Sequence, residues 1–199
     1  MTYQPATPAP RTSATKIILI IVAIVVAIML LCGGVLAAIL VPSLSRARAA
    51  AQEARLGANA RQIVTAVVMY AAGSNDEAPP HLAATITMGA LDPEALRDKR
   101  FNRPAMAMPP AGADWRSIRA DVDAHSDFVY LGEGLKLNKL SSPQDCPVVY
   151  AKDPLSKGEI LTGFADGHVE KLPPARFRAA FADLNSERAS QKLPPLPAP

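Results

Sequence analysis

The sequence predicts an α+β fold in which a long N-terminal helix, first within a membrane and then exposed, packs on a small antiparallel sheet. Three observations predict it: an uncharged apolar run near the N-terminus, a helical spacing of apolar residues that continues to about residue 72, and short strand-like segments in the second half. The 199 residues leave room for one ordinary domain beside such a helix.

The apolar run covers residues 17–41, which are 25 consecutive residues without a charge. About 20 such residues already span the hydrocarbon core of a bilayer. A segment in hydrocarbon must satisfy its own backbone hydrogen bonds, so we predict that residues 17–41 form a transmembrane helix. Residues 1–16, which are rich in Pro, Thr and Ala, are predicted to form a disordered tail.

Three other interpretations of the run stay open. A cleaved signal peptide has an apolar region of about 7–15 residues, which is shorter than this run. The buried helix of a soluble protein is also seldom so long. A lipid attachment site at Cys32 would need a small residue before it, and Leu31 stands there. Cys32 and Cys146 are predicted to be free thiols, because one lies in the apolar run and the other far away in the second half.

Small residues inside the run form two overlapping pairs, Gly33 with Ala37 and Gly34 with Ala38. Pairs with this spacing let two membrane helices approach closely. They predict a helix-packing face through which the chain could form a homo-oligomer. Gly and Ala are also common in membrane helices without such a role.

The helix is expected to continue beyond the membrane over residues 42–72. Pro42 lacks a backbone N–H and is predicted to kink it. Helical spacing then predicts an apolar stripe, with arginines on the other side. The stripe consists of Leu44, Ala47, Ala51, Ala54, Ala58, Val64, Val67, Val68 and Ala71. The sequence Gly73-Ser74-Asn75-Asp76 is expected to end the helix.

Residues 73–192 are predicted to form a small α+β domain. Short helices are expected over 81–90 and from 92, strands over 127–131 and 147–151, and a last helix after Pro173-Pro174. Residues 97–125 show no clear period. Residues 193–199 are predicted to be a disordered proline-rich tail.

A β-hairpin is predicted over residues 160–172. Asp166 and Gly167 lie between two apolar-bearing runs, and Asp-Gly is a preferred pair for a two-residue type I′ turn. This register places Phe164 opposite Val169 and Leu161 opposite Leu172.

Composition and motifs give little support to catalysis, nucleic-acid binding or a cofactor. The net charge is +3, too small to indicate nucleic-acid binding. His81, His125 and His168 lack the paired spacing of metal ligands, and no phosphate loop or nucleophile motif occurs. Asp166 and Glu170 could join His168 in a cation site, but a solvent-facing histidine is the more common case. We therefore predict no catalytic, metal or cofactor site.

Five segments of the chain together carry a family resemblance: Pro42–Arg48, Asn59–Ile63, Met69–Ala71, Asp127–Gly132 and Phe164–Glu170. With the apolar run, they resemble the pseudopilins of bacterial type II secretion and other type IV pilin-like, prepilin-type proteins. The hairpin segment Phe164–Glu170 in particular is similar to the C-terminal signature of prepilin-like proteins of the planctomycete group.

The resemblance implies a pilin-like fold and a role as a structural or assembly component of a type II secretion-like system in the inner membrane. The implied partners are the membrane, other pseudopilin-like subunits and secretion-machine proteins. It also implies a cytoplasmic N-terminus and a domain that is periplasmic or extracellular. The arginine count alone predicts the opposite, since Arg46, Arg48, Arg55 and Arg61 follow the run while Arg11 and Lys16 precede it. We adopt the orientation that the resemblance implies.

The chain departs from the family directly before the apolar run. Prepilins carry a Gly-Phe-Thr-Leu-x-Glu-like processing site there, whereas this chain has Ser13-Ala14-Thr15-Lys16. The glutamate that pairs with a neighbour's N-terminal amine in the family is therefore missing. This departure favours an alternative function, a membrane-anchored binding or scaffold module that does not polymerise. A membrane-anchored enzyme is a third, weaker alternative.

Overall fold

The computed structural model describes residues 14–101, 103–104, 106–110 and 112–199, with the backbone alone for 14, 15, 35–37 and 39. The predicted disordered tail therefore lies outside the described residues, except for its last three positions. The fold is α+β, with a long helix α1 (Ala14–Gly73) followed by an antiparallel sheet of four strands. The chain divides into two compact units between Ala49 and Ala50, and α1 contributes to both.

The sheet is formed by β1 (Phe128–Tyr130), β2 (Pro147–Ala151), β3 (Ile160–Phe164) and β4 (Val169–Leu172), which pair in chain order. All three pairings are antiparallel. The predicted strands over 127–131 and 147–151 agree with β1 and β2, because their Val, Tyr and Phe content suits a buried sheet.

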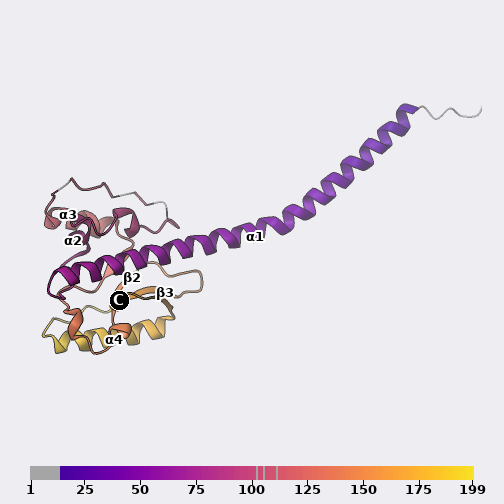
Figure 1. The fold of residues 1–199 in the computed structure, drawn as a ribbon. Helices are drawn as coiled ribbons and strands as arrows, with labels where there is room; N and C mark the ends of the chain where they lie inside the picture. The colour runs from indigo at the N-terminus through magenta and orange to yellow at the C-terminus, as the bar shows by residue number, and fades with distance from the viewer. Residues whose placement is uncertain (1–13, 102, 105, 111) are drawn as a thin grey trace, which may run out of the picture. The chain divides into compact units, whose positions relative to one another are not determined.

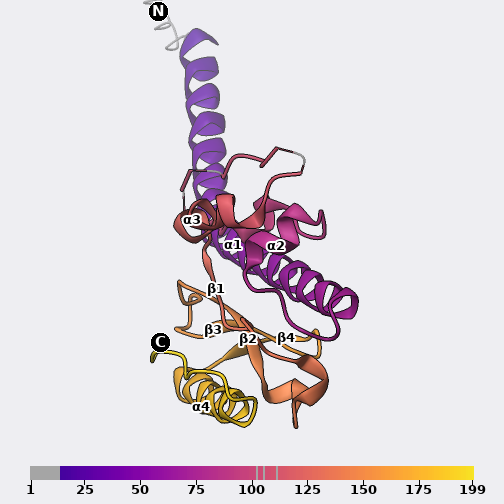
Figure 2. The same cartoon turned by 90° about the vertical axis from the view of Figure 1, so that its left-hand side faces the viewer.

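Two helices sandwich this sheet, as Figures 1 and 2 show from perpendicular directions. The C-terminal half of α1 covers one face, and α4 (Pro174–Ser190) covers the other. On the α4 face the rings of Tyr150 and Phe177 lie 4.9 Å apart. The short helices α2 (Leu82–Thr87) and α3 (Trp115–His125) lie against each other on the α1 side of the domain.

The part of α1 after residue 55 belongs to the hydrophobic core rather than to an exposed stem. Its buried residues recur at helical spacing and include Leu56, Ala60, Ile63, Val64 and Val67. The predicted stripe is therefore correct for only three of its nine residues. Val64, Val67 and Ala71 are buried, whereas Leu44, Ala47, Ala51, Ala54, Ala58 and Val68 are exposed. Leu and Ile fill more of the gap to the sheet than alanine, which explains why the buried stripe runs through Leu56 and Ile63.

The end of α1 follows the sequence prediction. The helix ends at Gly73, and Asn75 and Asp76 then adopt left-handed conformations with φ of 57° and 61°. The N–H groups of Ser74 and Asp76 both donate to the carbonyl oxygen of Ala71 at 2.9 Å, so the last turn of the helix is capped.

The helices after α1 differ in how well the sequence predicted them. His81 caps α2 by accepting from the N–H of Ala83, and Asp92 caps the 3-10 helix η1 (Pro93–Leu96) in the same way. Helix α3 lies in the region where the sequence showed no period. Its Asp114 cap is a usable signal, but only Val122 on the helix is buried, so the apolar pattern is weak.

The segment after α4 is partly held against the domain, in contrast to the predicted disordered tail over 193–199. Leu193 and Leu196 pack against the core. The N–H of Leu193 donates to the carbonyl of Arg188, and the N–H of Leu196 donates to the side chain of Asn185. Two leucines with apolar surface to bury explain why the proline content did not lead to disorder.

The β3–β4 hairpin is shifted by one residue from the predicted register. Gly163 lies opposite Val169 and Leu161 opposite Lys171. The N–H of Phe164 donates to the carbonyl of His168, so the loop has three residues, 165–167, instead of Asp166 and Gly167 alone. Gly167 has φ +100° at the third loop position, as in three-residue hairpins that need a left-handed residue there.

Gly163 allows α1 to approach the sheet closely. A Cβ atom at this position would lie 2.4 Å from a methyl group of Val64 and 2.9 Å from one of Val149. Both distances are far shorter than a carbon–carbon contact of about 3.5–4.0 Å. The contact between α1 and β3 therefore requires a glycine at position 163.

We expect Gly163→Ala to lower the free energy of unfolding by about 1–3 kcal/mol, because the added methyl group overpacks the interface between Val64 and Val149. The measurement is chemical denaturation of the full chain in detergent, followed by the fluorescence of Trp115, the single tryptophan. Gly57→Ala is the matched control: Gly57 lies in α1 with open space around it, so alanine should be neutral or slightly stabilising. Equal stability of the two variants would contradict the close approach.

Candidate functional site

The exposed N-terminal half of α1 is the first candidate functional surface. Among the described residues, it holds the single helix long and apolar enough to cross a membrane, over Lys16–Gly34, and none of this segment is buried. Leu30, for example, is 72 % exposed. Apolar side chains in such a continuous exposed row require lipid or another helix around them. A signal sequence near the N-terminus has the same properties.

The predicted helix-packing residues lie at the end of this segment. Gly33 and Gly34 have no atom within 4 Å of an added Cβ position, and Ala38 is exposed. The side chain of Ala37 lies outside the described part of the chain. The predicted packing face is thus open at the three described positions, and its use in oligomerisation remains a prediction.

Pro42 lies inside α1, which continues through it. The hydroxyl groups of two neighbouring serines bond to backbone carbonyls of the same turn: Ser43 donates to Leu40 at 2.8 Å and Ser45 to Pro42 at 2.9 Å. Such bonds to the preceding turn often accompany a bend. The kink at Pro42 remains a prediction.

The exposed stripe of α1 lies on the side opposite its buried stripe. Positions 44, 47, 51, 54 and 58 repeat at three- and four-residue intervals, as in a coiled-coil seam, and all five residues are exposed. At about 100° per residue, Ala54 is some 200° around the helix from Leu56. We call Leu44, Ala47, Ala51, Ala54 and Ala58 the stem stripe.

Glu53 holds α1 to the hairpin on the sheet. Its carboxylate accepts from the hydroxyl of Ser156 at 2.5 Å and from the ammonium of Lys171 at 2.8 Å. These two bonds, that of Lys171 first, lower the pKa of Glu53 from 4.5 to about 2. Ser156 lies in the β2–β3 loop and Lys171 on β4, so one side chain ties the helix to two separate elements.

An ionic cluster around the buried carboxylates of Asp98 and Asp127 holds the loop after η1 to the sheet, and the sequence analysis did not identify it. Asp127, only 2 % exposed, accepts from the guanidinium of Arg103 and from the N–H of Asp98. Arg103 also binds Asp153, and Arg100 binds Asp98. The bonds to Asp127 and Asp153 raise the pKa of Arg103. Apart from Arg100 and Asp98, the partners are 24 to 50 residues apart, so only the polar residue directly before β1 could have indicated the cluster.

The three histidines each bind a neighbouring carboxylate. His81 joins α2 to α3 through Asp123 at 2.8 Å, and its other ring nitrogen accepts from Ala83, which places the proton on Nε2. His125 bonds to Asp121 one turn earlier. In the predicted hairpin turn, His168 bonds to Asp166 at 2.6 Å and stacks on Phe164, with centroids 4.3 Å apart. The structure thus gives each histidine a local structural partner.

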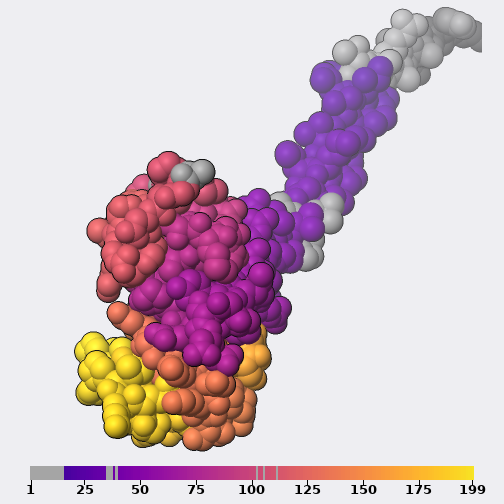
Figure 3. All heavy atoms as spheres, turned by 60° about the vertical axis from the view of Figure 1, so that its left-hand side comes forward, coloured from indigo at the N-terminus to yellow at the C-terminus, as the bar shows by residue number. Residues whose placement is uncertain are grey.

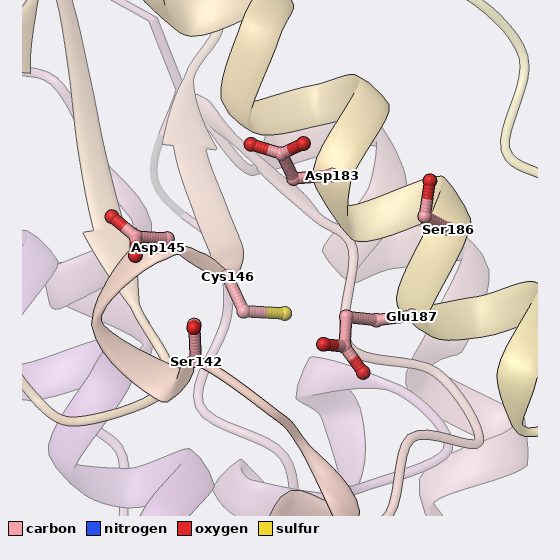
Figure 4. A pocket seen from close by; sticks show the side chains of 6 residues that line it. All are labelled: Ser142, Asp145, Cys146, Asp183, Ser186 and Glu187. Carbon is pink, nitrogen blue, oxygen red and sulfur yellow. The ribbon is translucent and has the colours of Figure 1, made fainter.

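Acidic residues line a hollow of about 240 Å³ between α4 and the turn before β2 (Figure 4). Asp145, Asp183 and Glu187 surround it, and the sulfur of Cys146 points into the space between them. Burial raises the pKa of the Cys146 thiol to about 12, so the thiol is protonated and unreactive at neutral pH. Within the described part of the chain, no group of three or more His, Cys, Asp or Glu residues has the arrangement of a metal site.

Comparisons of the chain with family models, with curated proteins and with solved structures gave no match.

The Glu53 contact predicts acid sensitivity. The low pKa of Glu53 stabilises the fold above pH 4.5, and this contribution is lost as the pH falls from 4.5 to about 2. We expect the free energy of unfolding to fall over this pH range in the wild type by about 1–2 kcal/mol more than in Glu53→Gln. This magnitude takes into account that solvent around the half-exposed Lys171 weakens the ion pair. Denaturation of the full chain in detergent, repeated at several pH values, measures this difference.

Glu159→Gln is the control, since Glu159 lies in the same loop region without an ion pair among the described residues. It should keep the acid dependence of the wild type. The same pH dependence in Glu53→Gln and Glu159→Gln would show that Glu53 does not hold α1.

Proposed function

We propose that the chain is a single-pass, membrane-anchored subunit with a pilin-like architecture, acting as a structural or assembly component of a type II secretion-like system. The observation that carries the proposal is the double role of α1. One uninterrupted helix presents an exposed apolar segment over Lys16–Gly34 and then supplies the core of an α+β domain from Leu56 onward. A domain built on its own anchor cannot detach from the membrane without losing its core.

The stem stripe supports assembly through α1. Small side chains at coiled-coil spacing let a second helix approach closely, and the buried stripe on the opposite side leaves this face free. In the proposal, neighbouring subunits pack side by side along this stripe and along Gly33, Gly34, Ala37 and Ala38. The hairpin with Asp166, Gly167 and His168 lies on the outer surface of the proposed assembly.

The proposal includes an orientation with the N-terminus in the cytoplasm and the domain outside the inner membrane. It rests on the resemblance of the stem and hairpin segments to pseudopilins. The arginines at positions 46, 48, 55 and 61 favour the opposite orientation. They are all exposed, and none forms an ion pair with a described residue, so they could also act at an assembly surface.

A non-polymerising anchored module is the second candidate. The observation that favours it is the sequence Ser13-Ala14-Thr15-Lys16 in place of a processing motif and its glutamate. In this case α1 would anchor a binding or scaffold domain, and the stem stripe would face solvent.

Cysteine cross-linking separates the two candidates. The full chain with Cys32→Ala and Ala54→Cys is expressed in its membrane and mildly oxidised. If α1 helices pack along the stem stripe, Ala54→Cys should form disulfide-linked dimers. In spheroplasts, a membrane-impermeant maleimide should label the same residue, because the proposal places the stem outside.

Gln52→Cys is the matched control. Gln52 is exposed on the same turn but about 200° away from Ala54, so it should be labelled without forming dimers. Buried Cys146 should not interfere. Absence of Ala54→Cys dimers would favour the anchored module, and labelling only after permeabilisation would overturn the orientation.

A further inference from the structure

The proline-rich segment after α4 reverses direction and runs back along that helix. Lys192, with φ 60°, makes the reversal directly after α4. Leu193 then bonds to Arg188, Leu196 bonds to Asn185, and Pro199 lines the same hollow as Phe177. The segment therefore passes the helix from its last turn to its first.

The length of this path requires an extended chain. From Lys192 to Pro199 the polyproline II rise of 3.1 Å per residue gives about 22 Å. The stretch from Phe177 in α4 to Gln191, the residue directly after this helix, is about 21 Å long at 1.5 Å per residue. The two lengths agree, so the segment has the extension of a polyproline II helix.

A polyproline II helix has three residues per turn, and the two leucines of the segment that pack against the domain are three residues apart. Leu193 and Leu196 face the domain and pack against its core, whereas Pro199 is exposed at the edge of the hollow that Phe177 also lines. The other positions all point to solvent. They are Pro194, Pro195, Pro197 and Ala198, which we call the proline ridge. Figure 3 shows this part of the chain, in yellow, on the surface of the domain.

Two side chains of α4 fix the segment in place. Asn185 bonds to both the N–H and the carbonyl of Leu196, at 2.8 and 3.4 Å. Arg188, only 4 % exposed, donates to the carbonyl of Pro194 at 2.9 Å and to that of Glu133 at 2.9 Å. Burying a guanidinium among carbonyls is costly, and here it orders a surface segment. A ligand ordered in advance loses less entropy when it binds.

The beginning of the proline ridge lies beside positive charge. Lys136, Lys139 and Lys192 line a hollow of about 600 Å³ there, against one carboxylate, that of Glu77. A partner domain that binds along the proline ridge would therefore have this net positive charge beside one end of its binding surface.

We propose that the proline ridge is a docking ligand for a protein domain whose groove is lined by aromatic side chains and carries acidic residues at one end. Aromatic-lined grooves recognise polyproline II ligands through the exposed proline rings, and acidic residues beside the groove pair with a basic flank. Leu193 and Leu196 stay packed on the domain during binding, so the domain need not unfold to present its ligand.

The test uses the full chain in detergent and two probes, a purified SH3 domain with an acidic groove end and a purified WW domain. We expect saturable binding of the SH3 domain in a fluorescence titration, and binding at least about tenfold weaker for Pro194→Ala/Pro197→Ala. Lys139→Glu/Lys192→Glu should weaken binding several-fold in low salt and less in high salt.

Pro110→Ala removes an exposed proline elsewhere and should bind like the wild type. The denaturation midpoint, followed by Trp115, shows whether each variant is folded. The proposal would be overturned if neither the SH3 domain nor the WW domain bound saturably. Unchanged binding by folded Pro194→Ala/Pro197→Ala would also overturn it.

Discussion

The contact between Val64 on α1 and Gly163 on β3 is the constraint on which the rest of the domain depends. It brings the helix closer to the sheet than any side chain at position 163 would allow. At this separation the buried stripe of α1 fills the space above the sheet, with Leu56, Ile63 and Val67 inside the core. Because the same helix carries the apolar segment Lys16–Gly34, the segment able to span a membrane and the core of the domain belong to one element.

Polar contacts complete this attachment at the edges of the apolar interface. Glu53 reaches two parts of the β-sheet region, and Asn59 donates to the carbonyl of Arg97 at 2.9 Å. Asp127 binds Arg103 and thereby holds the loop after η1 to the sheet. In each of these contacts, a charged or hydrogen-bonding partner compensates for the removal of a polar group from water. The partners meet in only one arrangement of the elements, so the contacts are specific for this arrangement.

The sequence was informative where a signal is local. The apolar run, the stop after Gly73 and the strand β2 follow from residues adjacent in the chain, and the structure agrees with each. The apolar stripe was correct for only three of its nine residues, because alanine spacing alone does not tell which side of a helix meets a sheet. The hairpin register was off by one, since an Asp-Gly pair fits both two- and three-residue loops and the choice depends on the pairing of Phe164 with His168.

Contacts between distant residues could not be predicted from one sequence. The cluster around Asp127 joins residues far apart in the chain, and Glu53 meets Lys171 across 118 positions. Such pairs have no period or motif, so only the folded chain reveals them. The packing of Leu193 and Leu196 on α4 is a similar case, because the proline content suggested a solvated tail.

Hydrogen–deuterium exchange of the full chain in lipid nanodiscs tests most directly whether one helix serves both membrane and core. The amides of residues 17–34 should exchange slowly because they lie in lipid, and those of residues 56–71 should exchange as slowly as the strands β2 and β3. Fast exchange over 56–71 with protected strands would contradict the account, because the sheet would then be stable without α1.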